Sequence, residues 1–296
     1  MKLRLLNSSM LCLLVLTSGL LAHNSGHHHQ NSEHSQIQES GNNYTPIECT
    51  IVPKQVSESH ISHPHIPGPR TSRVPAGQVT STNWSGYAAA TNLSSPTRNS
   101  VSAVSGSWIV PTIVSSGGNT SSSLWIGIDG YNSSTVEQIG TEHDFTGGAQ
   151  QHSAGFEMYP GGSYGISGFP LHPGDVISAS VVYTGSNTFV MTLMNDTQKV
   201  SYTVPTQYTK SSVALRESAE WIVEAPYLNG ILPLSNFATA YMWGCVAIIN
   251  GVAGPIGTSS WQNVGIEMTT TNGTPKDLTS PLLPDKGSFF VTWKHQ

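Results

Sequence analysis

The feature that most constrains the fold of this chain is a series of short strand-like runs, which starts near Asn83 and continues to the C-terminus. Runs rich in β-branched and aromatic residues alternate with Gly, Pro, Ser and Asn, and no long helical period interrupts them. Such a series predicts an all-β sandwich or barrel. Strands are expected at 101–110, 124–128, 135–140, 152–158, 176–183, 189–194, 199–204, 219–223, 239–249, 264–269 and 288–293.

Charged residues make up only 10% of the 296-residue chain, well below the roughly one quarter that is usual for a globular domain. From position 84 onward, 13 acidic residues stand against 7 basic ones. Acid would neutralise the carboxylates and leave a modest positive charge, so self-repulsion at low pH would be weak. The sequence shows no basic cluster, and we therefore expect no nucleic acid among the partners.

The first 22 residues have the pattern of a secretory signal peptide. Lys2 and Arg4 precede an apolar run at 10–21, and Ala22 offers a small residue for cleavage. The run is too short to predict a membrane span. We therefore expect a secreted, extracellular protein without stable membrane insertion.

Residues 23–78 differ in composition from the rest of the chain. They hold eight of the twelve histidines, together with prolines and few large apolar side chains. We interpret them as a His- and Pro-rich propeptide or linker that precedes a β domain at 79–296. The His tracts have no fixed ligand geometry, so no metal site is predicted. A pH-sensing role is a hypothesis, because imidazoles become charged as the pH falls through about 6.5.

The run S-A-E-W-I-V-E at 218–224 reads as a strand with a carboxyl among apolar neighbours. Its period of two places Ala219, Trp221 and Val223 on one face, and Glu220 on the other. In a water-poor site the pKa of a carboxyl rises, which suits it for proton transfer. The alternative is an exposed, solvated glutamate. Glu224 cannot complete a dyad with Glu220, because the two positions lie about 13 Å apart along a strand.

The stretch L-W-I-G-I-D-G-Y-N-S-S-T-V-E-Q-I-G-T at 124–141 reads as two strands around a turn. Glycines on a strand face leave room for another backbone, as a groove for an extended peptide requires. Gln138 suits Glu220 as a partner, because an amide can donate to an oxyanion and accept from water without like-charge repulsion. The alternative is an exposed amide on an edge strand.

The third informative stretch, Q-H-S-A-G-F-E-M-Y-P at 151–160, places small residues beside a carboxyl and a phenol. Ser153, Gly155, Glu157 and Tyr159 share one face of the expected strand. Glu157 either tunes a neighbouring carboxyl or is a solvated charge, and the residues alone leave both interpretations open.

Five motifs together resemble the glutamic peptidases, also called eqolisins. They are N-W-S-G-Y at 83–87, W-I-G-I-D-G at 125–130, E-Q-I-G-T at 137–141, F-E-M-Y-P at 156–160 and A-E-W-I-V-E at 219–224. The motifs follow in the right order over roughly the last seven tenths of the chain. The resemblance implies a secreted, acid-active, pepstatin-insensitive endopeptidase that is made with a propeptide. It also implies a two-sheet antiparallel β-sandwich of the concanavalin-like kind.

The resemblance also implies roles for individual residues. Glu220 and Gln138 match the dyad, which would activate water for direct attack on the peptide carbonyl without a covalent intermediate. The expected substrate-binding residues are Trp84, Trp125, Asp129, Glu157 and Tyr159. Ser153 and Gly155 depart from an acidic or aromatic pattern common in the family, so the cleft is expected to differ there. We expect protein or peptide substrates, a monomer, and neither cofactor nor metal.

Four other functional classes are alternatives to a glutamic peptidase. An aspartic peptidase would need paired D-T/S-G motifs, and only Asp129 comes close. The motif G-G-S-Y-G at 161–165 fits G-x-S-x-G but lacks a preceding strand and a following helix. Residues 142–144, E-H-D, lack the spacing of a metal-ligand set. The non-enzymatic alternative is a lectin-like module that binds carbohydrate or peptide, because one fold hosts both functions.

Overall fold

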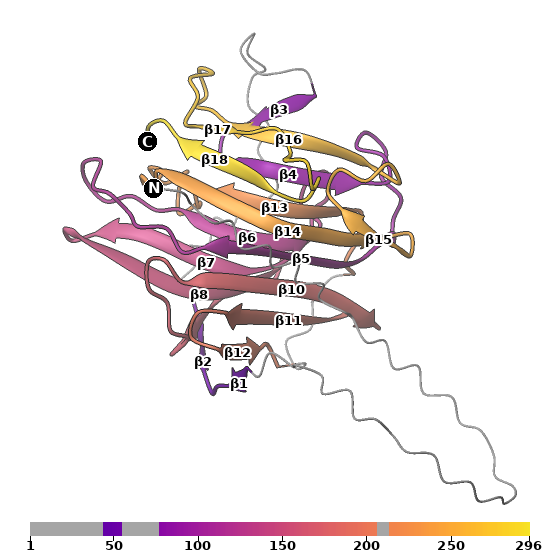
Figure 1. Cartoon of the computed structure of the whole chain (residues 1–296), viewed down its shortest axis with the longest axis horizontal. Coiled ribbons are helices and arrows are strands. Elements are labelled where there is room, and N and C mark those ends of the chain that lie inside the picture. Colours follow the sequence, from indigo (N-terminus) through magenta and orange to yellow (C-terminus); the bar gives the residue numbers. More distant parts are fainter. Residues whose placement is uncertain (1–43, 55–76, 206–212) are drawn as a thin grey trace, which may run out of the picture. The chain divides into compact units, whose positions relative to one another are not determined.

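The computed structural model describes residues 44–54, 77–205 and 213–296. In this part of the chain the regular elements are all β-strands, and they form the two sheets of a sandwich (Figure 1). The predicted all-β sandwich is confirmed. Among the described residues, none forms a helix long and apolar enough to cross a membrane.

Each sheet has nine strands. The first sheet contains, in spatial order, β1 (Thr45–Pro46), β12 (Val200–Thr203), β11 (Thr188–Asn195), β10 (Val176–Gly185), β5 (Val101–Ile109), β14 (Thr239–Ile249), β18 (Phe289–Trp293) and β17 (Asp277–Thr279), with β15 (Val252–Pro255) paired to β14. The second contains β2 (Thr50–Pro53), β9 (Ser163–Ser167), β8 (Ala149–Tyr159), β7 (Val136–Thr146), β6 (Ser123–Ile128), β13 (Ser218–Glu224), β4 (Trp84–Ala90), β16 (Gln262–Met268) and β3 (Gln78–Ser81).

All the strands expected from the sequence are present, and most of their bounds shift by one or two residues. The largest difference is β7, which continues six residues beyond the expected end at position 140 because it pairs along its full length with β8. The sandwich is not purely antiparallel. β1 runs parallel to β12 and β3 runs parallel to β16, both at sheet edges.

The main core lies between the sheets, where the alternation of each strand directs its apolar side chains. Two buried tryptophans link the sheets through hydrogen bonds from their indole N–H groups, because a buried indole N–H needs an acceptor. Trp221 Nε1 of β13 donates to the carbonyl of Ser105 on β5 at 2.8 Å. Trp108 Nε1 of β5 donates to Thr141 Oγ1 on β7 at 2.9 Å.

A smaller apolar cluster lies on the opposite face of the second sheet. It includes Trp84, Trp125 and Ile222, which alternate with the core-facing residues of their strands. The predicted alternation of β13 is thus confirmed, because Ala219, Trp221 and Val223 belong to the main core instead. The second sheet is therefore buried on both faces around β13, and this arrangement places polar groups of β13 in an apolar setting.

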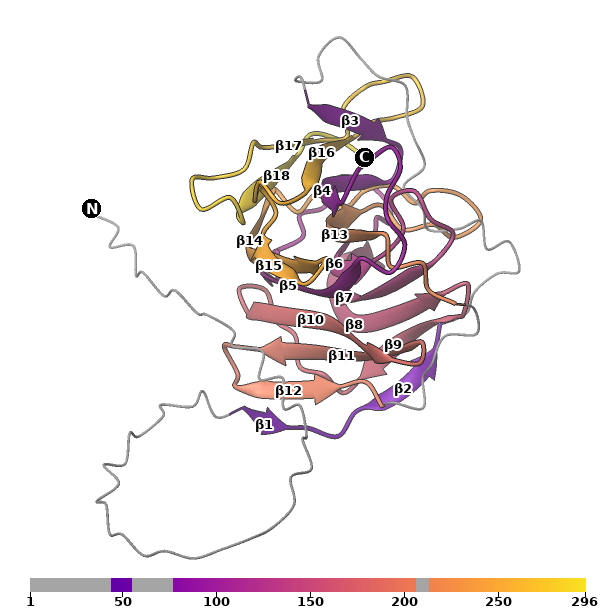
Figure 2. The ribbon, with the colours of Figure 1, turned by 90° about the vertical axis from the view of Figure 1, so that its right-hand side faces the viewer.

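Part of the segment expected to be a propeptide or linker packs on the sandwich. β1 and β2 extend one edge of each sheet, and Figure 2 shows them running along that end of the two layers. Ile47, Cys49 and Ile51 pack against the core. The predicted signal peptide and the His tracts at 27–29 and 60–65 lie outside the described residues.

Candidate active site

One row of paired residues crosses the centre of the second sheet. Ala88 of β4 pairs with Glu220 of β13, which pairs with Gly127 of β6, which pairs with Gln138 of β7, which pairs with Glu157 of β8. Directly paired residues project from the same face of a sheet. The structure therefore brings Glu220 and Gln138 to one face, on either side of a glycine.

Gly127 leaves the space between the two side chains open to small groups only. A Cβ at this position would lie 3.1 Å from the Cβ of Gln138 and 3.2 Å from Cζ3 of Trp125. These contacts are tighter than ordinary packing, so a glycine is needed here. The position matches the expectation that glycines on these strands make room for another group.

Gln138 is held by its neighbour on β8. Its Nε2 donates to Oε2 of Glu157 at 2.7 Å, while its Oε1 has no hydrogen-bond partner among the described residues. Both side chains are buried, at 8% and 2% exposure. The alternative of an exposed amide on an edge strand is wrong, because β7 lies between β6 and β8. The bond to Glu157 fixes the amide plane and leaves one N–H and the carbonyl oxygen available.

Glu220 is fully buried, so the alternative of an exposed glutamate is also wrong. Burial raises the pKa of its carboxyl well above the ordinary value, and the nearby acids Asp129 and Glu137 raise it further. Ser218 and the backbone of Tyr131 oppose this rise. Neither carboxyl oxygen has a hydrogen bond of good geometry within the described residues. Burial therefore favours the protonated, neutral form of this carboxyl.

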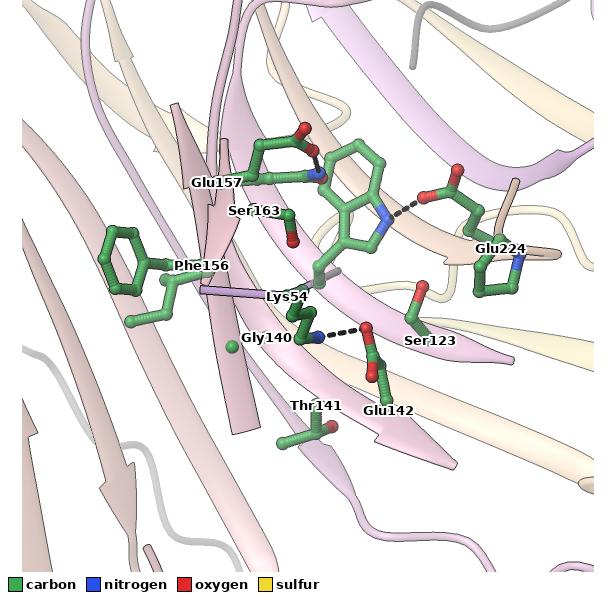
Figure 3. A pocket seen from close by; sticks show the side chains of 14 residues that line it. Lys54, Ser123, Gly140, Thr141, Glu142, Phe156, Glu157, Ser163 and Glu224 are labelled. Atoms are coloured by element: carbon green, nitrogen blue, oxygen red, sulfur yellow. Dashed lines mark hydrogen bonds and ion pairs between the residues drawn. The ribbon is translucent and has the colours of Figure 1, made fainter. Parts of the chain in front are cut away.

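A groove opens next to this row (Figure 3). Gln138 and Glu157 line it together with Trp125 and Glu224, whereas Glu220 does not. Its floor includes Gly140 and Gly155, which are paired with each other across β7 and β8. A Cβ at Gly140 would collide with the backbone of Leu124 and with Trp125, so the close approach of these strands requires a glycine.

A lysine of the N-terminal segment reaches into the groove. β2 pairs antiparallel with β9, and the backbone N–H of Lys54 donates to the carbonyl of Ser163 at 3.0 Å. The Lys54 ammonium forms an ion pair with Glu142, which Figure 3 shows from close by. It also lies 2.9 Å from where a Cβ of Gly155 would be. The departure at Gly155 thus makes room for a basic side chain.

Three residues expected to bind substrate lie outside the groove lining. Trp84 is fully buried and packs edge-to-face on Trp125, with ring centroids 4.9 Å apart. Tyr159 lies at the end of β8, paired with Val136. Asp129 has left-handed backbone (φ 73°) at the end of β6.

The Asp129 carboxylate organises the entry to β13. Its Oδ1 accepts from the backbone N–H of Glu217 at 2.7 Å, and its Oδ2 accepts from that of Arg216 at 2.6 Å and from Thr135 Oγ1 at 2.8 Å. Its own N–H donates to the carbonyl of Ser218 at 2.9 Å. These bonds fix the start of β13 to the end of β6. They thereby help to position Glu220, which lies two residues after Ser218. A direct role in substrate binding stays a prediction for Asp129, Trp84 and Tyr159.

The sequence did not predict four other residues that line the groove, which are Lys54, Ser123, Glu142 and Ser163. The signal for Glu142 was present, because it lies four residues after Gln138 and so shares its strand face. Nothing in the sequence places Lys54 opposite Glu142. Within the described residues, no cluster of three potential metal ligands occurs. Ser163 begins strand β9, so the helix that G-x-S-x-G requires does not follow it.

Solved structures of three peptidases resemble this fold. The first is scytalido-glutamic peptidase with a transition state analog inhibitor, at 22% identity and a TM-score of 0.60, covering 72% of this chain and 98% of that one. The second is SCP-B, a member of the eqolisin family, in a complex with the tripeptide Ala-Ile-His, at 20% identity and a TM-score of 0.56, with the same coverage. Aspergilloglutamic peptidase from Aspergillus niger follows at 22% identity and a TM-score of 0.52, covering 59% of this chain and 99% of that one.

No curated protein sequence matches the chain. The Peptidase A4 family model, in contrast, matches residues 82–293. This span begins just before β4 and ends with β18, so it includes the whole row from Ala88 to Glu157. The chain therefore belongs to the Peptidase A4 family, the glutamic peptidases or eqolisins, and is a glutamic endopeptidase.

Proposed function

We propose that the protein is a secreted, acid-active endopeptidase in which Glu220 and Gln138 activate water for peptide hydrolysis. The observation that carries the proposal is the row in which these two side chains flank Gly127 on one sheet face. A water molecule in this gap would be within reach of a carboxyl and an amide at once. Such a pair has the groups that general acid–base catalysis and oxyanion stabilisation require.

In the proposed reaction, the carboxylate of Glu220 takes a proton from the water, and the water oxygen attacks the scissile carbonyl. The N–H of Gln138 that is not bound to Glu157 donates to the oxyanion of the tetrahedral intermediate. Glu220, now protonated, gives its proton to the leaving amine as the C–N bond breaks. The products are a carboxylic acid and an amine, and the dyad returns to its first state.

The protonation of Glu220 sets a condition on this mechanism. While the carboxyl is buried, its raised pKa keeps it protonated in acid, and it cannot act as a base. Contact with water and with the Gln138 amide would lower the pKa by solvating the charged form. The base is therefore generated only when water or substrate reaches the gap beside Gly127.

The proposed substrates are extended segments of protein chains. One extended segment already pairs with this sheet beside the groove, because β2 runs along β9 and Lys54, the next residue, lines the groove. Main-chain pairing to a sheet edge binds peptides with little dependence on sequence. Secretion, removal of a propeptide and insensitivity to pepstatin are part of the proposal and follow from the resemblance of the motifs.

The test is hydrolysis of acid-denatured protein between about pH 2 and 7 with pepstatin present. Glu220→Gln and Gln138→Ala are each expected to lower kcat by about 10²–10³, the usual effect of losing one such group. Glu267→Gln is the matched control, since Glu267 is a buried carboxyl of the same sheet on β16, away from the groove. Full activity in either dyad variant would move the catalytic site elsewhere. A wild type that binds peptides or sugars without cleaving them would favour the lectin-like alternative.

Secretion and processing have a separate test. Expression of the full chain followed by N-terminal sequencing of the protein in the medium is expected to give a start after position 22, and a start near position 79 once the propeptide at 23–78 has been removed. Retention in the cell with Met1 intact would contradict the secretion part of the proposal and leave the dyad untouched.

A further inference from the structure

The indole of Trp125 covers the gap between the two dyad residues. Trp125 and Gly127 lie two residues apart on β6, so both face the groove side of the sheet. Cζ3 of the indole lies 3.2 Å from where a Cβ of Gly127 would be. Since Gly127 separates Glu220 from Gln138, the ring leans over the place where the catalytic water has to bind.

The burial of the dyad residues agrees with this position of the Trp125 indole. Gln138, Trp125 and Glu224 all line the groove, but Glu220 does not, and its side chain is fully buried. The groove thus reaches one member of the dyad and stops at the indole before the other. Trp125 itself is only 3% exposed, so it fills the passage rather than bordering it.

Two contacts hold the indole in this position. Its Nε1 donates to Oε2 of Glu224 at 2.7 Å, a short bond to a carboxyl group. Its ring packs edge-to-face on Trp84 at 4.9 Å. Asn83 Nδ2 donates to the other oxygen of Glu224 at 3.4 Å, which helps to fix that carboxyl. Glu224 lies on the same face of β13 as Glu220, so the holding group and the catalytic carboxyl come from one strand.

A second position of the indole would lie toward the neighbouring strand. Trp125 pairs directly with Gly140 of β7, and Gly140 pairs with Gly155 of β8. Both glycines line the groove, and the Lys54 side chain lies next to Gly155. A rotation about the Cα–Cβ bond would bring the indole toward Gly140 and Lys54, away from Gly127, at the cost of the bond to Glu224.

We propose that Trp125 is a gate over the catalytic gap and that Glu224 is its latch. Substrate and water reach Glu220 only after the indole leaves Gly127 and its N–H leaves Glu224. Glu224 is a positioning residue, because it acts on the reaction through the indole. The inference rests on the proposed function, since it assumes that the gap between Glu220 and Gln138 is where hydrolysis occurs.

The gate makes catalysis depend on the fraction of molecules in the open state. Glu224→Gln leaves one acceptor oxygen for two donors, Trp125 Nε1 and Asn83 Nδ2, so one of the two hydrogen bonds at the latch is lost. The open population, and with it kcat/KM, is expected to rise by about fivefold. Trp125→Phe removes the donor altogether and serves to assign the signal of Trp125 in the experiment below.

The experiment is fluorine NMR of the full chain labelled with 5-fluorotryptophan, in the Glu220→Gln background so that substrate is not cleaved. The probe is oxidised insulin B chain. Its addition is expected to shift or broaden the Trp125 resonance, and Glu224→Gln alone is expected to move it in the same direction. Glu267→Gln is the control and should leave it unchanged. A purely structural role of Glu224 would lower the melting temperature without moving the Trp125 resonance toward its peptide-bound position.

Different results would contradict the gate proposal and the dyad proposal. A Trp125 resonance that neither the peptide nor Glu224→Gln changes, in a protein whose wild type hydrolyses the same peptide, overturns the gate alone. A wild type that does not hydrolyse the peptide, although both changes move the resonance, overturns the dyad and leaves Trp125 as a movable residue held by Glu224.

Discussion

Gly127→Ala places a methyl group in the gap between Glu220 and Gln138. The new Cβ would lie 3.1 Å from the Cβ of Gln138, 3.1 Å from the carbonyl oxygen of Glu137 and 3.2 Å from Cζ3 of Trp125. Each neighbour has to move by a few tenths of an ångström. Overpacking of this kind costs about 1–3 kcal/mol of stability, which lowers the melting temperature by roughly 2–12 °C for a domain of this size.

The effect on the reaction is expected to be larger than the effect on the fold. The methyl occupies the volume in which the water has to contact both dyad residues. Losing one stabilising contact in the transition state raises the barrier by about 2.7–4 kcal/mol, so kcat should fall by at least 10²–10³. The measurement is kcat on a peptide substrate well below the melting temperature, with thermal unfolding followed in parallel.

Gly165→Ala is the matched control. Gly165 belongs to β9, and its added Cβ would meet only the carbonyl oxygen of Val52 at 3.7 Å and Cε of Lys54 at 3.8 Å, both ordinary contacts. Wild-type activity is expected there. A Gly127→Ala protein that is folded and keeps kcat within about threefold of wild type would refute the claim that the dyad acts across this glycine, because it is far from the 10²–10³ loss expected.

Three further predictions concern charge. Burial raises the pKa of Asp277 to about 7 from 3.8. The stability that this carboxyl contributes is therefore present below pH 3.8 and is lost as the pH rises through 7. Asp277→Asn should remove up to about 4 kcal/mol of this pH dependence, measured by urea unfolding. Burial and the neighbouring His152 lower the pKa of His143 well below 6.5, which has the opposite sign: stability is lost as the pH falls below 6.5, and His143→Asn should flatten that acid limb. In the full chain, which keeps residues 23–78, Lys54→Ala should lower KM several-fold with kcat unchanged, because Lys54 would no longer compete with substrate for Glu142. An unchanged KM in steady-state kinetics would exclude that competition.

The sequence predicted the parts of the site that depend on strand alternation. Glu220 and Gln138 were assigned to faces by a period of two, and the register of β13, β6 and β7 places them as that assignment requires. The strands with clear alternation were predicted for the same reason. β4 was not among them, because its sequence W-S-G-Y-A-A-A is rich in Gly and Ala, which have a low propensity for strands.

Other features depend on contacts between distant segments, which no local pattern encodes. The position of the Trp125 indole is set by Glu224 on another strand and by the missing side chain of Gly127. The pairing of β2 with β9 places Lys54 at Glu142, although the composition around β2 predicts no packed structure. The bonds from the Asp129 carboxylate to the backbone at the entry to β13 also join distant segments, and a role of Asp129 in substrate binding stays a prediction.

The pairing of β1 and β2 also bears on the order of folding. These strands leave the ribosome first, yet their partners β12 and β9 are synthesised much later. Contacts of such long sequence separation form slowly, because a long loop has to close before they stabilise the chain. The sheet edges of β9 and β12 thus stay unpaired late in folding and are open to pairing with other chains. Docking of the N-terminal strands would then protect these edges for as long as the chain retains β1 and β2.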